Sequence, residues 1–279
     1  MATERPRRFS IEVDGLADGQ PAHLSVLRGG RERRRALLLH GFASDANDDW
    51  IETGWFEALV AAGYDVVAPD LRGHGLSTKS QNPRDYQLEA FAADSLAISK
   101  ACWGDSSFSV VGYSMGAHIA MTLSLASPKR IAHLVLGGMG ERIAATVGLA
   151  PEFADALDAA AEQSLDTSAF PPYAVRFCQH AALKPHNDLA VLAACLRGQT
   201  AVFDLAKLAQ IAAPTLVMVG EDDRLAGAPY RVASLFPAGI AATIPNANHA
   251  SALASDAFRA RALVHLDIAE PFCCHGGPS

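Results

Sequence analysis

The feature that most constrains this chain is the stretch Gly112-Tyr113-Ser114-Met115-Gly116, because of what flanks it. An apolar run typical of a buried strand, Phe108-Ser109-Val110-Val111, leads into it, and a helix-like pattern starts at Ala117. A serine on so sharp a strand-to-helix turn has a strained backbone, and glycines two residues before and after it remove collisions. The pattern predicts a hydroxyl held clear of a sheet at the start of a helix, where developing negative charge is stabilised. The structural alternative is a turn of small residues without a chemical role.

Composition favours one large folded unit. The chain has 279 residues, of which 50% are hydrophobic, and this suffices for a single core. Its net charge of -7 argues against a nucleic-acid partner, because such proteins present a basic face. The one basic run, Arg31-Glu32-Arg33-Arg34-Arg35, follows Gly29-Gly30 and is interpreted as a solvated hairpin turn. A binding patch is the less favoured reading of that run.

Targeting and metal-binding patterns are not evident. No apolar stretch follows the basic N-terminal residues, and no run is long enough to span a membrane, so a cytoplasmic protein without a membrane partner is expected. The five cysteines are scattered, and none of their spacings is backed by a second pair, so no metal site is expected. Adjacent Cys273-Cys274 are interpreted as part of a frayed tail. The oligomeric state is left open.

Apolar runs alternate with helical patterns along most of the chain, which predicts an α/β fold with a mainly parallel, doubly wound sheet. Strands are expected over residues 9–14, 22–28, 36–39, 64–68, 108–111, 131–136, 214–220 and 240–244, and helices over 55–62, 87–102, 117–127, 228–236 and 255–268. This rhythm breaks between residues 141 and 210, which are alanine-rich, helical and cut by prolines. We therefore expect a core of residues 1–140 and 211–279 and a helical cap inserted over 141–210.

Several motifs in this order resemble those of the α/β-hydrolase fold superfamily, in its esterase- and lipase-like version with a helical cap. The motifs are His40-Gly41, Asp70-Leu71-Arg72-Gly73-His74-Gly75-Leu76-Ser77, the Gly112–Gly116 stretch, Gly220-Glu221-Asp222-Asp223 and Asn246-Ala247-Asn248-His249. The resemblance covers residues 9 to 268. It is specific for the fold and much less so for the substrate, because this fold hosts many chemistries.

The resemblance implies a catalytic triad in the chain order nucleophile, acid, histidine. Ser114 is the nucleophile, and His249, in a loop before the last helix, is its base. Asp223 is the favoured acid, with Asp222 its near rival, while Glu141 after the preceding strand is a remote option.

The other implied groups surround the nucleophile. The backbone N–H groups of Phe42 and Met115 form the implied oxyanion hole. Asn248 departs from the glycine that similar proteins often have there, so the histidine loop is expected to run differently.

A serine at position 114 also selects the chemistry. Epoxide hydrolases and haloalkane dehalogenases of this fold attack with a carboxylate, whereas Ser114 implies an acyl-serine mechanism that needs no metal or organic cofactor. The expected partner is a small-molecule substrate. Its contacts are expected from four aromatic side chains in the loops and the cap: Phe42, Trp50, Tyr173 and Phe177. Arg142, Arg176 and His180 are candidates for holding a substrate carboxylate, although exposed polar faces explain them equally well.

Four functions remain open at this point. The leading one is hydrolysis of small or medium apolar carboxylic esters. The second keeps the triad but cleaves a C–C bond of a ring-fission diketone, a lactone or an amide, or performs perhydrolysis. The third is a hydrolase-fold receptor that binds a ligand and turns it over slowly, and the fourth is a lyase or synthase.

Overall fold

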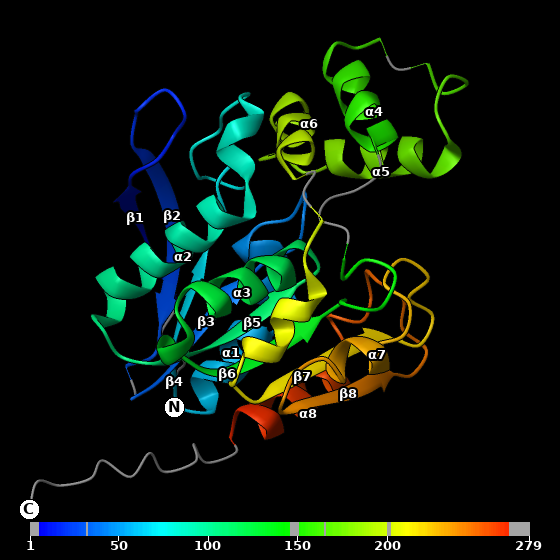
Figure 1. Cartoon of the computed structure of the whole chain (residues 1–279). Helices are drawn as coiled ribbons and strands as arrows, with labels where there is room; N and C mark the ends of the chain where they lie inside the picture. The colour runs from blue at the N-terminus through cyan, green and yellow to red at the C-terminus, as the bar shows by residue number, and fades with distance from the viewer. Residues whose placement is uncertain (1–5, 32, 146–150, 165, 200–201, 268–279) are drawn as a thin grey trace, which may run out of the picture.

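The computed structural model describes residues 6–31, 33–145, 151–164, 166–199 and 202–267. Eight strands form one sheet in the order β1-β2-β4-β3-β5-β6-β7-β8 (Figure 1). The strands are β1 Arg7–Val13, β2 Ala22–Gly29, β3 Arg34–Leu39, β4 Tyr64–Pro69, β5 Phe108–Tyr113, β6 Ile131–Gly137, β7 Thr215–Gly220 and β8 Gly239–Ile244. β1 pairs antiparallel with β2, and β2 with β4, whereas all pairs from β4 to β8 are parallel. The predicted mainly parallel sheet is confirmed, with β1 and β2 as an antiparallel hairpin at its edge.

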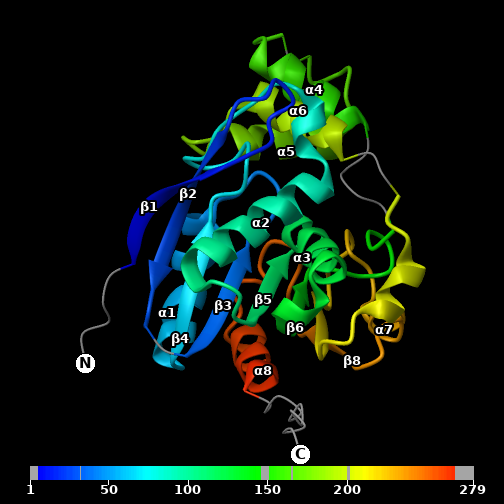
Figure 2. The ribbon, with the colours of Figure 1, turned by 60° about the vertical axis from the view of Figure 1, so that its left-hand side comes forward.

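Helices cover both faces of this sheet, as expected of a doubly wound fold (Figure 2). The helices of the sheet domain are α1 Trp55–Ala61, α2 Leu88–Trp103, α3 Met115–Ala126, α7 Tyr230–Ala233 and α8 Asp256–Leu266. α2, α3 and α7 bury apolar side chains in one core, and α1 and α8 bury theirs in a second core on the opposite face. Successive residues of β3 alternate between these cores, with Leu37 and Leu39 in the first and Leu38 in the second. This is why the central strands read as continuous apolar runs.

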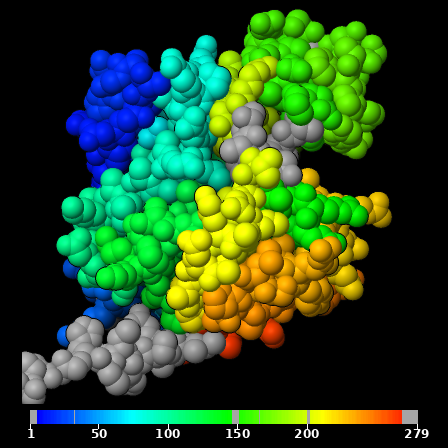
Figure 3. Space-filling view, in the orientation of Figure 1, coloured from blue at the N-terminus to red at the C-terminus, as the bar shows by residue number. Residues whose placement is uncertain are grey.

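Three further helices lie beyond the carboxyl ends of the strands. In the sequence they fall between β6 and β7. They are α4 Pro151–Ala161, α5 Pro172–Ala182 and α6 Leu189–Gly198. They bury a core of their own, which includes Leu157, Cys178 and Leu192. α4 and α5 project from the sheet domain, and a recess opens beneath them in the space-filling view (Figure 3). We call these three helices the insertion.

The insertion is shorter than the segment 141–210 expected from the sequence. On one side of it, Ala144 is buried in the main core. On the other side, a 3₁₀-helix at Leu205–Gln210 returns to the sheet domain and buries Leu208 in the same core. The prolines and alanines predicted that the alternation of strands and helices is interrupted here. They did not predict where the chain returns to the core of the sheet domain.

Two local elements differ from expectation. Residues expected as a loop contain a short helix of π type at Asn47–Ile51, which we label η1, because the Asp45 carboxylate accepts the N–H groups of Asn47 and Asp48 while Trp50 is buried. α7 covers four residues of the expected 228–236, since Pro237 disfavours a helical conformation in the residue before it.

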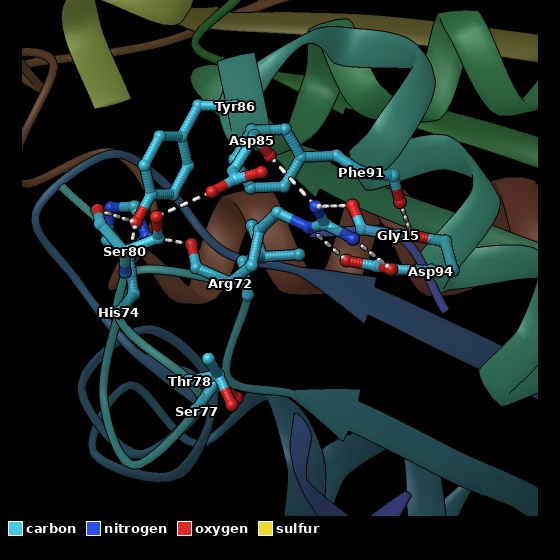
Figure 4. A network of polar contacts seen from close by, with 12 residues as sticks. Gly15, Arg72, His74, Ser77, Thr78, Ser80, Asp85, Tyr86, Phe91 and Asp94 are labelled. Carbon is cyan, nitrogen blue, oxygen red and sulfur yellow. Dashed lines mark hydrogen bonds and ion pairs between the residues drawn. The ribbon is translucent and has the colours of Figure 1, made fainter. Parts of the chain in front are cut away.

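A buried ion pair fixes the loop of residues 70–77 (Figure 4). The Arg72 guanidinium donates from Nε and Nη2 to both carboxylate oxygens of Asp94, at 2.6 and 2.7 Å, and from Nη1 to the carbonyl of Asp85 at 2.9 Å. Asp85 belongs to the 3₁₀-helix Pro83–Tyr86, and α6 of the insertion contacts this 3₁₀-helix. The contact is close: a side chain at Gly198 would meet the carbonyl of Pro83. The ion pair therefore supports the base on which α6 lies.

Among the described residues, no helix is long and apolar enough to cross a membrane. The same part of the chain contains no group of three His, Cys, Asp or Glu side chains arranged to hold a metal ion. Cys273 and Cys274 lie outside the described residues.

Candidate active site

Ser114 lies on the turn between β5 and α3, with φ 51° and ψ -110°. A positive φ at a non-glycine residue is strained, and it points the hydroxyl away from the sheet. The flanking glycines permit this turn, as the sequence pattern predicted. A Cβ at Gly112 would lie 2.3 Å from the carbonyl oxygen of Gly116, and a Cβ at Gly116 would lie 1.9 Å from that of Leu39.

A chain of hydrogen bonds joins Ser114 to His249 and Asp223. The Ser114 hydroxyl lies 3.0 Å from His249 Nε2, and His249 Nδ1 lies 2.7 Å from Asp223 Oδ2. With the proton on Nδ1, the imidazole donates to the carboxylate and its Nε2 is free to accept the serine proton. This is the geometry by which a base activates a serine and a carboxylate orients the base.

Asp223, and not Asp222, meets the histidine. Asp223 is buried, while Asp222 is exposed. The second oxygen of Asp223 accepts the backbone N–H groups of Leu225 and Ala226, at 3.1 and 2.8 Å, so both oxygens have partners. These bonds hold the carboxylate in a fixed orientation after the end of β7.

The histidine loop is fixed by its neighbours. Asn248, where glycine is common in similar proteins, accepts the N–H groups of Ala250 and Ser251 on its side chain, each at 3.0 Å. It thereby closes a side-chain turn directly after His249. The hydroxyl of Tyr113 donates to the carbonyl of His249 at 2.5 Å, which ties the loop to the residue before the nucleophile.

The loop after β3 passes beside the nucleophile. A Cβ at Gly41 would lie 3.8 Å from the Ser114 Cβ. Phe42 follows in this loop, and Met115 opens α3, where backbone N–H groups have no acceptor within the helix. Asp49 holds the loop, because its carboxylate accepts the Gly41 N–H at 2.8 Å and the Ser44 hydroxyl at 2.5 Å. Phe42 and Met115, whose N–H groups are expected to form an oxyanion hole, thus belong to the two segments that adjoin the serine.

A pocket of about 390 Å³ opens over Ser114 and His249, between the sheet domain and the insertion. Its apolar wall includes Phe42 and Phe177, whose rings stack with centroids 5.8 Å apart. The polar part of its wall includes Asp49, His180 and Lys184. Lys184 is already paired, at 2.5 Å, with the Asp48 carboxylate of η1, and this ion pair joins the insertion to the sheet domain.

Two of the four expected substrate contacts lie elsewhere. Trp50 is fully buried in the core beneath η1, where its ring packs edge-on against Trp55. The Tyr173 side chain is exposed, donates its hydroxyl to Glu152 and packs against Phe153, outside the pocket wall. Neither residue lines the pocket, so both expectations are wrong. An aromatic residue that is close to the site in sequence can instead pack against its own part of the structure.

Of the three candidates for binding a substrate carboxylate, one lines the pocket and two do not. His180 lines the pocket. Arg142 instead donates to the backbone carbonyl of Arg224, and Arg176 is exposed on α5 outside the pocket wall. Among the described lining residues, Lys184 is the one lysine or arginine.

Sequence reasoning missed Asp49 and Tyr113 as supports of the site. No motif pointed to Asp49, and Tyr113 stood only as the variable position between Gly112 and Ser114. A carboxylate eight residues after Gly41 carries no local signal, because its hydrogen bond to the loop depends on η1 turning back.

Three other histidines, His40 and His74 in the loop motifs and His118 on α3, serve structure. His40 donates from Nδ1 to the Gly41 carbonyl at 2.8 Å and accepts the N–H of Leu71 on Nε2 at 2.9 Å, so it joins two loops. Burial lowers the pKa of His74 to about 3, with a smaller effect of nearby His40. Burial likewise lowers the pKa of His118 to about 4, and its Nε2 donates to the carbonyl of Ile143. Both are therefore neutral at physiological pH and unsuited to accept the serine proton.

Comparison with known proteins agrees with this geometry. A family profile described as alpha/beta hydrolase fold matches residues 37–167. The chain is 34% identical over 126 residues to epoxide hydrolase B of Mycobacterium tuberculosis, covering 44% of this chain and 31% of that protein. It is 31% identical over 139 residues to the 2-hydroxy-6-oxononadienedioate/2-hydroxy-6-oxononatrienedioate hydrolase of Burkholderia vietnamiensis, covering 46% and 44%. The matched segments thus span less than half the length of these curated relatives.

Similarity to solved structures extends over most of the chain. The crystal structure of a hydrolase from Pseudomonas aeruginosa PA01 matches with a TM-score of 0.70 and 25% identity, over 92% of this chain and 98% of that one. The strand order, the sharp turn at Ser114 and these matches show that the chain has the α/β-hydrolase fold.

Proposed function

We propose that the protein hydrolyses carboxylic esters of small or medium apolar acids through an acyl intermediate on Ser114. The hydrogen-bonded chain of Ser114, His249 and Asp223 carries this proposal. Ser114 attacks the ester carbonyl as His249 Nε2 takes its proton, and the N–H groups of Phe42 and Met115 stabilise the oxyanion. The imidazolium then protonates the leaving alcohol, and water repeats the cycle to release the acid.

The pocket wall supports an apolar substrate. Phe42, Phe177 and Leu225 line the pocket, and apolar area is favourable to bury. Its volume of about 390 Å³ lies at the small end of ligand pockets, which suits a short or medium acyl chain. We further propose that the insertion acts as a cap, because α5 supplies Phe177 and His180 to this wall.

Cleavage of a C–C bond is the second candidate, supported by the similarity to the Burkholderia vietnamiensis hydrolase. The name of that relative describes dianionic substrates, which call for a free cation beside the nucleophile. The pocket disfavours this reading, since Lys184 is neutralised by Asp48 and Arg176 lies outside the wall. The similarity to epoxide hydrolase B carries less weight for activity, since position 114 is a serine here.

The test is a screen of p-nitrophenyl esters from acetate to palmitate with the wild type and Ser114→Ala. We expect a chain-length optimum at short or medium acids and a loss of kcat on the order of 10⁴- to 10⁶-fold in the variant, with the fold retained. A loss below about tenfold contradicts the role of Ser114. Negligible turnover by the folded wild type, together with cleavage of a ring-fission diketone, transfers the proposal to C–C hydrolysis.

A further inference from the structure

A second pocket adjoins the one over Ser114. It has a volume of about 650 Å³ and is lined by η1, the loop of residues 70–77 and the segment that follows α5. The residues that line both pockets are Asp49, His180, Lys184, Ala250 and Leu253. The two pockets therefore share a border. This border passes beside the proposed base, because Ala250 follows His249 directly in the chain.

The chemistry of ester hydrolysis assigns the two pockets to two parts of an ester. The base that takes the serine proton later delivers it to the leaving oxygen, so the alcohol part has to lie within reach of His249. The second pocket begins on that side, whereas the rings of Phe42, Phe153 and Phe177 line only the pocket over Ser114. An apolar acyl chain is therefore expected against these rings, and the alcohol part in the second pocket.

The wall of the second pocket carries more carboxylates than cations. Its described lining contains five carboxylate side chains against one arginine and one lysine, together with two histidines. Both cations are engaged. Arg8 pairs with Asp70 at 2.8 Å, and Lys184 pairs with Asp48 at 2.5 Å.

The other three carboxylates, Asp45, Asp49 and Glu52, form no ion pair with any residue that the structure describes. Uncharged groups donate to them: backbone N–H groups to Asp45 and Asp49, and the side-chain amide of Asn47 to Glu52 at 3.1 Å. Lys79 acts electrostatically on Asp45 but does not line the pocket. The wall thus attracts a positive charge and repels a negative one.

Exposed apolar side chains in the same wall are an independent observation. Leu76 is 56% exposed and Leu183 is 79% exposed, and both line the second pocket, one from the loop of residues 70–77 and one from the segment after α5. Covering such side chains is favourable, and exposed apolar surface around a cavity is typical of a binding site. The occupant is therefore expected to present alkyl surface as well as charge.

We propose that the second pocket receives the alcohol part of the substrate, and that this alcohol carries an alkylated ammonium group. The positive charge complements the three carboxylates, while the alkyl groups cover Leu76 and Leu183. The inference rests on the ester hydrolysis proposed for Ser114 and names its substrate class, esters of an apolar acid with a cationic amino alcohol.

The test compares butyrylcholine with its uncharged carbon isostere, 3,3-dimethylbutyl butyrate. Because the two alcohols also differ as leaving groups, the readout is how the ratio of their kcat/KM values changes between proteins. Asp45→Asn/Glu52→Gln keeps the shape of both side chains and removes two negative charges. It should lower the ratio at least about fivefold at low ionic strength. Raising the salt concentration to about 0.5 M should lower the ratio of the wild type as well, because salt screens the attraction.

Glu89→Gln/Asp105→Asn is the matched control, because it removes the same charge from exposed residues of the chain outside the pocket wall. It should keep the ratio of the wild type. The ratio is taken within one protein, so a partly folded preparation does not alter it.

Hydrolysis of p-nitrophenyl butyrate separates the two ways in which the proposal can fail. If the wild type cleaves this ester through Ser114 but Asp45→Asn/Glu52→Gln leaves the ratio unchanged, the cationic alcohol site is overturned and ester hydrolysis stands. An equal fall in the ratio of the control variant also overturns the site, because the effect would then come from net charge alone. If the wild type cleaves none of the three esters, both proposals are overturned.

Discussion

At the scale of single residues, side chains outside the proposed triad hold the loops that carry its members and the proposed oxyanion hole. Asp49 accepts the Gly41 N–H and so fixes the loop that carries Phe42, while Tyr113 holds the carbonyl of His249. Neither side chain was singled out by the motifs from which the triad is proposed. Ser114 was predictable because its strain requires glycines at fixed local spacings, whereas Asp49 and Tyr113 act through partners far along the chain.

Tyr113→Phe tests this support for the histidine loop. Loss of the hydrogen bond to the His249 carbonyl lets the imidazole drift from Ser114, so kcat should fall about 3- to 10-fold while KM stays nearly constant. Steady-state kinetics with a p-nitrophenyl ester measures both values. Tyr64→Phe is the control, because it removes a similar buried bond, from the Tyr64 hydroxyl to the carbonyl of Leu266, at the other end of the sheet. Equal losses of kcat in the two variants would reduce Tyr113 to a general contributor to stability.

At the scale of elements, apolar patterns predicted all eight strands, because buried parallel strands read as apolar runs and the edge hairpin alternates. Helix ends were harder to predict. η1 depends on the Asp45 carboxylate and on burial of Trp50, and α7 is cut short before Pro237. The contact of α6 with the sheet domain was not predictable, because it depends on the 3₁₀-helix that follows the Arg72 loop.

Asp94→Asn tests how strongly the buried ion pair supports this region. Arg72 and Asp94 are 2% and 3% exposed, so the substitution leaves a buried guanidinium without a carboxylate to balance its charge. The free energy of unfolding should fall by about 3–5 kcal/mol in urea titrations. Asp155→Asn serves for comparison, because its ion pair with Arg197 is exposed and should contribute at most about 1 kcal/mol. A loss for Asp94→Asn no larger than for Asp155→Asn would contradict the structural role.

At the scale of the whole molecule, the order of the strands brings distant loops together over Ser114. The sequence indicated which loops carry the proposed triad, since the resemblance implies their order. It did not indicate which aromatic residues face the pocket: Phe42 and Phe177 stack in its wall, while Trp50 is buried in a core. Packing between segments far apart in the sequence decides which aromatic side chains face the pocket, so no local sequence pattern reveals them.

Buried neutral histidines predict how stability depends on pH. The folded protein lowers the pKa of His118 to about 4 and that of His74 to about 3, mainly through burial, from an ordinary value of 6.5. Between pH 6.5 and 4 the unfolded chain therefore binds more protons than the folded one, so stability is present above pH 6.5 and is lost as the pH falls. Each histidine should cost up to about 1.4 kcal/mol per pH unit.

Urea unfolding at pH 7 and pH 5 measures this loss. His118→Gln should unfold more easily at pH 7 but lose less stability on acidification than the wild type, because one of the two linked protons is gone. His23→Gln is the control, since the His23 side chain is 60% exposed. An equal acid-induced loss in the wild type and His118→Gln would show that this histidine is not linked to folding.

The acyl-serine intermediate is the central claim, and its direct test is to trap it. During turnover of p-nitrophenyl butyrate, acylation by the good leaving group is fast, so acid quenching followed by peptide mass spectrometry should find butyrate on Ser114. The adduct should disappear in Ser114→Ala along with turnover. A butyryl group on another residue, or continued turnover by Ser114→Ala without any adduct, would contradict the account.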